Sequence, residues 1–99
     1  MKIYISGKIS GLRPKDVRAI FNRAAYEISL RDNTPINPLE NGLTSDHPWI
    51  LHMMVDLWML KQCDAIFMLP NWRQSRGAII EFIMAKLLRK QIFKCKQPK

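Results

Sequence analysis

Two carboxylate side chains stand where the surrounding sequence predicts apolar helix faces. Glu81 lies among residues expected to be buried in a helix, namely Ile79, Ile80, Phe82, Ile83 and Met84. Asp56 lies on the apolar stripe of a helical run from Trp49 to Leu60. Burying an unpaired charge costs several kcal/mol, which is a large part of the net stability of about 5–15 kcal/mol that a folded protein has. A backbone amide or an arginine can satisfy each acid, but the pair predicts two carboxylates that converge on one pocket.

Two segments of the chain are suited to bind an anion. Gly7 and Gly11 flank a short loop in which glycine leaves the backbone N–H groups unobstructed, and the loop residues are Lys8, Ile9 and Ser10. Ser75 and Gly77 stand where a helix is expected to begin, and a helix N-terminus offers unpaired N–H donors and a partial positive charge. Ser75 can also be a simple N-cap, and the two roles are compatible. Together with the two acids, these segments predict a nucleotide pocket.

The sequence does not predict a metal, redox or cofactor site. Cys63 and Cys95 are the only cysteines and neither has a Cys-x-x-Cys partner, so we expect unbridged thiols. His52 and Asp56 are four residues apart, which is a metal-ligand spacing, but no clear third ligand accompanies them. We therefore expect no metal and no cofactor.

Hydrophobic periodicity predicts strands and helices that alternate along the chain. Helices are expected over residues 14–30, 46–60 and 75–89, and strands over residues 2–6, 34–37, 65–69 and 91–95. Ser45 or Asp46 is expected to cap the second helix, with Pro48 in its first turn. This helix is apolar nearly all round, so it needs cover on two sides: the sheet on one and, we expect, a second subunit on the other.

This alternation predicts one α/β domain over residues 1–99. The expected architecture is a three-layer sandwich of the flavodoxin or Rossmann type, with a short, mainly parallel sheet of about four strands. Ligands bind such sheets beyond the carboxyl ends of the strands, at the switch point between the first and third strands. The rule selects the loops 7–11 and 70–76. It places Asp64, which precedes the third strand, at the opposite end, where capping a turn is the expected role.

Composition limits the partners that we expect. The chain carries a formal net charge of +8, but many of its basic residues crowd the last helix and the tail, where a solvated face is the usual explanation. It contains no RNP, KH or zinc-finger pattern, so nucleic acid is not expected as a partner. No apolar run approaches the roughly 18 residues that span a bilayer, and no signal peptide is visible. We therefore expect a cytoplasmic protein that does not enter membranes.

The sequence resembles the nucleoside 2-deoxyribosyltransferase superfamily, and in particular its small branch of bacteria and phages. The likeness runs in order through Ile3 to Gly11, Asp46-His47-Pro48, Asp56-Leu57, Cys63 to Leu69 and Ser75 to Glu81. The resemblance implies that Glu81 attacks the anomeric carbon of a 2-deoxyribonucleoside, and that Asp56 positions the sugar and handles the departing base. Transferases usually carry an aspartate at the position of Ser75, whereas the related monophosphate hydrolases carry a serine that contacts the 5′-phosphate. Ser75 therefore favours a nucleotide substrate.

Such a carboxylate nucleophile would form a covalent glycosyl intermediate, with retention at the anomeric carbon. Tyr4 is expected to lie under the sugar, to order Glu81, or to be a core tyrosine. Trp72 is expected to stack on a base, and Arg73 or Arg76 to face phosphate, unless these are exposed loop residues without a role.

The leading hypothesis is an N-glycosidase or deoxyribosyltransferase that acts on a 2-deoxynucleotide as a homodimer or a larger homo-oligomer. A catalytically silent nucleotide-binding module is the first alternative. A basic nucleic-acid-binding protein is the second, and the pocket acids argue against it because carboxylates repel a phosphate backbone.

Overall fold

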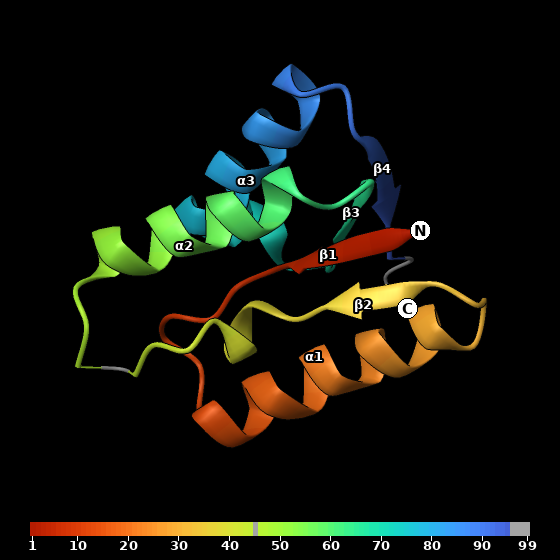
Figure 1. Ribbon diagram of the computed structural model, residues 1–99. Coiled ribbons are helices and arrows are strands. Elements are labelled where there is room, and N and C mark those ends of the chain that lie inside the picture. Colours follow the sequence, from red (N-terminus) through yellow and green to blue (C-terminus); the bar gives the residue numbers. More distant parts are fainter. Residues whose placement is uncertain (45, 96–99) are drawn as a thin grey trace.

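A parallel four-stranded sheet with helices on both faces forms the centre of the molecule (Figure 1). The structure is a computed structural model that describes residues 1–44 and 46–95. Its strands are β1 (Lys2–Ser6), β2 (Thr34–Ile36), β3 (Ala65–Met68) and β4 (Gln91–Lys94). Its α-helices are α1 (Pro14–Ser29), α2 (Trp49–Lys61) and α3 (Arg76–Leu87), and the short 3-10 helices are η1 (Pro38–Glu40) and η2 (Trp72–Gln74). The predicted three-layer α/β architecture is confirmed.

The strand order β2-β1-β3-β4 places the topological switch point between β1 and β3. All three strand pairs are parallel, and Tyr4 of β1 is in register with Ile66 of β3. The carboxyl ends of β1 and β3 therefore lie side by side, as the sequence predicted. Asp64 lies at the other end of the sheet, where its Oδ2 accepts a hydrogen bond of 2.9 Å from the backbone N–H of Lys2.

The alternation of side chains along the strands divides the core into two clusters. Ile3, Ile5 and Ala65 point to one face and pack with Val17 and Phe21 of α1. Tyr4, Ile66 and Met68 point to the other face, and their cluster includes Leu60 of α2 and Ala78 and Ala85 of α3. In Figure 1, α2 and α3 accordingly lie on the side of the sheet opposite α1.

Two glycines permit close approaches that shape the carboxyl edge of the sheet. A Cβ atom on Gly7 would lie 2.5 Å from Leu69 Cδ1 and 2.9 Å from Leu69 Cβ, so only glycine lets the chain leave β1 beside the end of β3. A Cβ atom on Gly77 would lie 3.1 Å from Met53 Sδ, which shows how closely the start of α3 packs on α2.

Helix α3 is less buried than its sequence predicts. Its buried residues are Ala78, Glu81 and Ala85, whereas Ile83 is 51% exposed and Ile79 and Ile80 are also exposed. The prediction that the apolar neighbours of Glu81 are all buried is therefore wrong. The reason is that α3 presents only a narrow stripe to the sheet, and nothing in the described part of the chain covers its outer side.

The predicted cap of the second helix is also wrong where it can be examined. The N-cap of α2 is Pro48, none of the described side chains forms a capping hydrogen bond, and Asp46 is exposed. Ser45 lies outside the described residues. A proline fits this position because its carbonyl accepts the first helical hydrogen bonds, from the N–H groups of Leu51 and His52.

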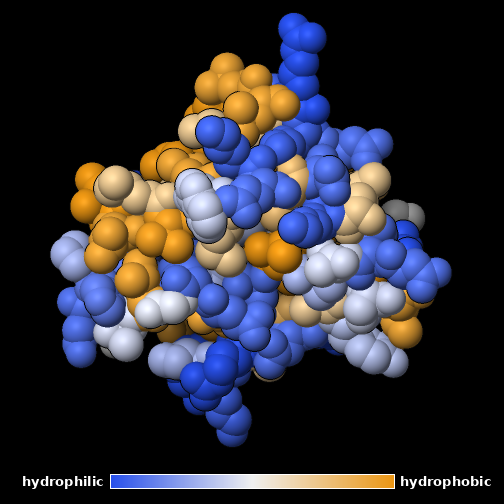
Figure 2. Space-filling model, viewed as in Figure 1, coloured by the Kyte–Doolittle hydropathy of each residue, from blue (hydrophilic) through white to orange (hydrophobic). Residues whose placement is uncertain are grey.

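Apolar side chains are exposed on the layer formed by α2 and α3, which we call the apolar outer face. Its most exposed members are Trp49, Ile50, Met54 and Trp58 of α2 and Ile79, Ile80, Ile83 and Leu87 of α3. In Figure 2, hydrophobic side chains gather over these two helices. None of the helices described is both long enough and apolar enough to cross a bilayer.

Candidate active site

Glu81 lies at the centre of the candidate site, with a hydrogen bond to each oxygen of its carboxylate. The Tyr4 hydroxyl donates to Oε2 and the Ser6 hydroxyl donates to Oε1, both at 2.6 Å. Tyr4 and Ser6 are two residues apart in β1, so they share the sheet face under α3. All three side chains are buried, and Glu81 is 5% exposed. The glutamate is thus a buried acid satisfied by two hydroxyl groups of the sheet.

Opposing effects set the protonation of Glu81. Burial disfavours the charged form and is the main cause that raises its pKa from 4.5 to about 7. The hydrogen bonds from Ser6 and Tyr4 lower the pKa, whereas the negative charge of Asp56 raises it. Burial and the charge of Glu81 also raise the pKa of Tyr4 well above its ordinary value, so Tyr4 remains a hydrogen-bond donor. Glu81 therefore exchanges a proton near neutral pH.

Asp56 is the second buried acid, at 6% exposure, and a polar network from the loop after β2 holds it. Asn41 Nδ2 donates to Asp56 Oδ1 at 2.9 Å, and Asn41 Oδ1 accepts from the backbone N–H of Leu43 at 3.0 Å. His52, one helical turn before Asp56, lies 3.3 Å from Asn41 Nδ2 through its Nδ1. Burial raises the pKa of Asp56, and the contacts with Asn41 and His52 oppose that rise. Asp56 belongs to α2, whose Leu60 packs in the same core cluster as Tyr4 of β1 and Ala78 of α3, so both acids come from the helix layer on one side of the sheet.

The two loops that the topology rule selected are joined directly. The backbone N–H of Lys8 donates to Asn71 Oδ1 at 3.0 Å, so one N–H group of the first loop is engaged by the second loop. Gly11 adopts a φ of +83°, a conformation that favours glycine. Ile9 and Ser10 are exposed at the surface of this loop.

Ser75 caps helix α3, as one of its two predicted roles requires. Its Oγ accepts a hydrogen bond of 3.2 Å from the backbone N–H of Ala78, and Gly77 occupies the first turn. The guanidinium of Arg76 lies 5.1 Å from the ring centroid of Trp49, which brings a cation to the place where α2 and α3 both begin. The start of α3 thus combines a capping hydroxyl, helix N–H groups and a fixed positive charge.

Trp72 belongs to a stack on the other side of α3. Its indole ring stacks on Phe82 with centroids 4.6 Å apart, and the cationic groups of Arg73 and Lys94 lie over the indole at 5.2 and 5.8 Å. The stack joins η2, α3 and β4. Stacking of a base on Trp72 stays a prediction. The base would have to contact the part of the indole ring that Phe82, Arg73 and Lys94 leave free.

The structure reveals positioning residues that were not recognised in the sequence. Ser6 was detectable, because a polar residue two positions after Tyr4 in a buried strand must share the face of Tyr4. Asn41 and Asn71 belong to loops, where asparagine usually indicates a turn, and no local pattern shows that their side chains reach Asp56 and the first loop. The described residues contain no group of three or more histidine, cysteine, aspartate or glutamate side chains placed to hold a metal ion.

Comparisons with known proteins bear on the family and the fold of this chain. The sequence matches the family described as "Domain of unknown function (DUF4406)" over residues 1–94. The fold is similar to that of a 2-desoxiribosyltransferase from Leishmania mexicana, with a TM-score of 0.72 and 23% sequence identity. The similarity covers 94% of this chain and 62% of that chain, so this chain spans under two thirds of the length of the other protein. No curated protein matches the sequence.

Proposed function

The chain belongs to the DUF4406 family, within the nucleoside 2-deoxyribosyltransferase-like superfamily, and from its buried carboxylates we propose that it cleaves or transfers an N-glycosidic bond of a 2-deoxynucleoside 5′-monophosphate. The observation that carries this proposal is Glu81, a buried carboxylate held by two hydroxyl groups at the carboxyl edge of the sheet. A group placed in this way is costly for folding, and the same arrangement suits a nucleophile. We propose that residues 1–99 form one domain of this kind.

Glu81 acts as the nucleophile in the proposed reaction. One carboxylate oxygen forms a bond to the anomeric carbon while the bond from that carbon to the base nitrogen breaks, and the base leaves with the bonding electrons. Water, or a second base, then attacks the anomeric carbon, gives up a proton to the Asp56 carboxylate and releases Glu81, so that the configuration is retained. Tyr4 and Ser6 keep the carboxylate in one orientation and favour its ionised form.

Asp56 assists the departing base. Burial raises its pKa, so a proton on Asp56 is held more tightly than in water and can pass to the base nitrogen as the glycosidic bond breaks. Its negative form also stabilises the positive charge that develops on the sugar. Asn41 fixes the carboxylate for both purposes.

The start of α3 and the loop after β1 receive the 5′-phosphate. Ser75 and Gly77 contribute hydroxyl and N–H donors. The loop of Gly7, Lys8, Ile9, Ser10 and Gly11 is joined to the segment that leads to α3 by the hydrogen bond from the Lys8 N–H to Asn71. The formal net charge of +8 also attracts an anionic small molecule such as a nucleoside monophosphate.

Release of free base is the direct test of this function. The purified protein is incubated with each common deoxynucleoside monophosphate and with the matching nucleosides, and free base is measured by chromatography. We expect release from at least one monophosphate and none by Glu81→Gln, which keeps the size of the side chain but removes its charge. Activity retained by Glu81→Gln would exclude Glu81 as the nucleophile.

A catalytically silent nucleotide-binding module is the second candidate. The observation that favours it is the low exposure of Glu81, whose two oxygens are both engaged by protein hydroxyls. In that case, the deoxynucleotide panel would show binding by calorimetry without any release of base.

A further inference from the structure

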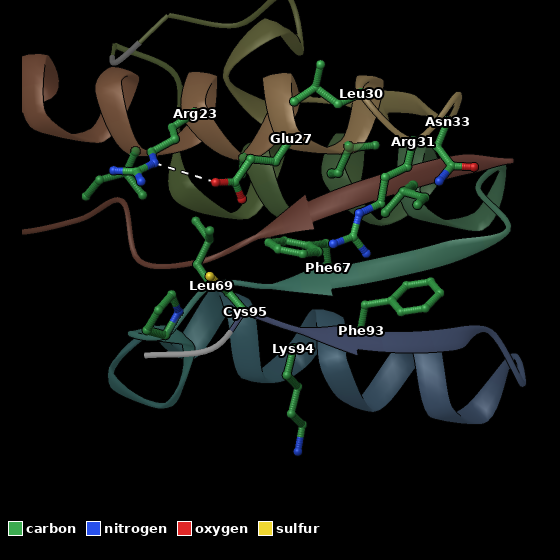
Figure 3. Close-up of a pocket in the computed structure, with 15 residues that line it drawn as sticks. Arg23, Glu27, Leu30, Arg31, Asn33, Phe67, Leu69, Phe93, Lys94 and Cys95 are labelled. Atoms are coloured by element: carbon green, nitrogen blue, oxygen red, sulfur yellow. Dashed lines mark ion pairs between the residues drawn. The ribbon is translucent and has the colours of Figure 1, made fainter. Parts of the chain in front are cut away.

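One sheet face is covered by a helix on one side only. Helix α1 packs against β1 and β2 and reaches Ala65 of β3, whereas Phe67 of β3 is only partly buried and Phe93 of β4 is exposed on that side. A cleft of about 980 Å³ occupies this place, and Phe67 of β3 and Phe93 of β4 lie on its floor (Figure 3). Ile20, Ala24 and Ile28 of α1 also line it. None of the residues proposed for catalysis lines it.

The dimensions and chemistry of this strip match an α-helix. Adjacent strands lie about 4.8 Å apart, so two strands offer a width of about 10 Å, which is close to the diameter of a helix with its side chains. The floor and wall are apolar. Phe93 is 41% exposed and Ile20 is 40% exposed, Phe67 is partly exposed, and Ala24 and Ile28 are already buried. A helix with one apolar face would bury these side chains in the way that α2 and α3 bury the opposite face.

The charges around the cleft select the kind of helix. Arg31 extends from the end of α1 over the strands, and it has no acidic partner among the described residues (Figure 3). Glu27 is the only acid that lines the cleft, and it pairs with Arg23 at 3.6 Å. Lys94 points away from the cleft, toward Trp72 and Phe82. An occupant with an acidic flank would therefore pair with Arg31 as its apolar face covers the phenyl rings.

A second copy of this chain does not supply such a helix from the described residues. Asp16 and Glu27 are the exposed acids of α1, and each already pairs with an arginine nearby, Arg13 or Arg23. The only acids of α2 and α3 are Asp56 and Glu81, which are buried.

We propose that the strip over β3 and β4 binds an amphipathic helix of another protein, with its apolar side on Phe67 and Phe93 and an acidic side chain on Arg31. This surface lies on the face of the sheet opposite Glu81. The inference therefore holds or fails independently of the proposed catalytic function.

The test uses a synthetic helical peptide of about 18 residues, with leucines along one face and glutamates along both flanks. The peptide is titrated into the full-length, ¹⁵N-labelled protein and the amide signals are followed by NMR. We expect saturable changes at Phe67, Phe93 and Arg31, and none at Tyr4, Ser6 or Glu81. A peptide of the same composition in scrambled order is the control for unspecific hydrophobic binding.

Charge reversal makes the test specific. Arg31→Glu should lower the affinity for the glutamate-flanked peptide about tenfold or more. The variant should bind a matched peptide with lysine flanks more tightly than the glutamate-flanked one. Phe93→Gln should weaken both peptides. Arg31 and Phe93 are exposed, so both variants should fold, which the unchanged amide spectrum of the opposite face verifies.

Three results would overturn the proposal. The first is the absence of changes at Phe67 and Phe93 with the acidic peptide. The second is equal binding of acidic and basic peptides by the unmodified protein. The third is a concentration-dependent change at these residues without peptide, which would show that a second copy of the chain occupies the strip.

Discussion

At Glu81, burial and hydrogen bonding act in opposite directions on one carboxylate. Burial holds the pKa near 7, and the hydroxyl groups of Tyr4 and Ser6 prevent it from rising further. The ionised form needed for attack is thus available at neutral pH, although it is the form that the folded protein disfavours. The proposed reactivity and the stability of the protein therefore depend on the same proton.

The first prediction concerns stability as a function of pH. The folded pKa of Glu81, about 7, exceeds its ordinary value of 4.5, so the stabilising contribution of its proton is complete below pH 4.5 and is lost as the pH rises through 7. The loss is on the order of 3 kcal/mol. The glutamine in Glu81→Gln is neutral at every pH, so the variant does not lose this contribution. The free energy of unfolding of the variant minus that of the unmodified protein should therefore rise by roughly this amount between pH 4.5 and pH 8.

Urea unfolding of both proteins at several pH values measures this difference. Groups that titrate in both proteins cancel when the two free energies are subtracted, apart from those coupled to Glu81. A constant difference between pH 4.5 and pH 8 would show that the pKa of Glu81 is not raised in the folded state.

The second prediction concerns Ser6. Ser6→Ala removes a hydrogen bond to a charged group, which contributes about 1.5–3 kcal/mol, so the pKa of Glu81 should rise above 7. Base release at pH 7 should then fall roughly tenfold and recover at higher pH. ¹³C NMR of labelled glutamate reads the pKa without any need for activity. Ser6→Thr retains the hydroxyl and is the matched control; an unchanged pKa in Ser6→Ala would leave Ser6 without a positioning role.

At the same scale, the sequence indicated the acids but not all of their partners. Glu81 and Asp56 were found because a charge on an apolar helix face is costly, and both are buried as expected. The contact of Asn41 with Asp56 depends on how the loop after β2 folds back against α2. No periodicity in the sequence encodes that path.

Among the elements, the start of α3 carries both a structural and a proposed binding role. Ser75 caps the helix through Ala78, and the same N-terminus is the proposed phosphate site. The two roles can be separated, because aspartate caps a helix as well as serine does but repels a phosphate.

The third prediction uses this difference. Ser75→Ala should lose about 1 kcal/mol of stability together with affinity for the monophosphate. Ser75→Asp should unfold at the same temperature as the unmodified protein. It should bind the monophosphate much more weakly and still bind the corresponding nucleoside. Thermal unfolding and calorimetric titration with both ligands supply the measurements. Equal affinity of the unmodified protein for nucleoside and monophosphate would count against a phosphate site at α3.

The boundaries of the elements were predicted closely, whereas the burial of α3 was not. Strand β1 and the start of α1 agree with their predictions because Gly7 and Pro14 are strong local signals. The exposure of Ile79, Ile80 and Ile83 depends on what lies outside α3, and local sequence carries no information about that.

At the scale of the whole molecule, the order of the strands and the apolar outer side of α2 were predicted, whereas the other exposed surfaces were not. The alternation of elements predicted a parallel sheet with its switch point between β1 and β3, and the structure agrees. The contribution of α3 to the apolar outer face, and the strip over β3 and β4, became visible only when the layers were assembled. We propose that the first of these surfaces joins two copies of the chain, since contiguous apolar patches usually mark interfaces.

The fourth prediction is that this interface makes a homodimer, or a larger assembly built from it. Light scattering should give at least twice the chain mass of 11.6 kDa, and Trp58→Glu together with Ile83→Glu should reduce it to the monomer. Tyr26→Glu changes an equally exposed residue on α1 and should leave the assembly intact. A stable monomer at micromolar concentration would refute this interface.

The covalent intermediate is the most direct test of the central claim that Glu81 is a nucleophile. The protein is mixed with a deoxynucleoside monophosphate that it cleaves, quenched in acid within a single turnover, and examined by intact mass and peptide mapping. We predict an added deoxyribose phosphate on the peptide that contains Glu81, and none in Glu81→Gln. Base release without any adduct, or an adduct on another residue, would contradict the mechanism.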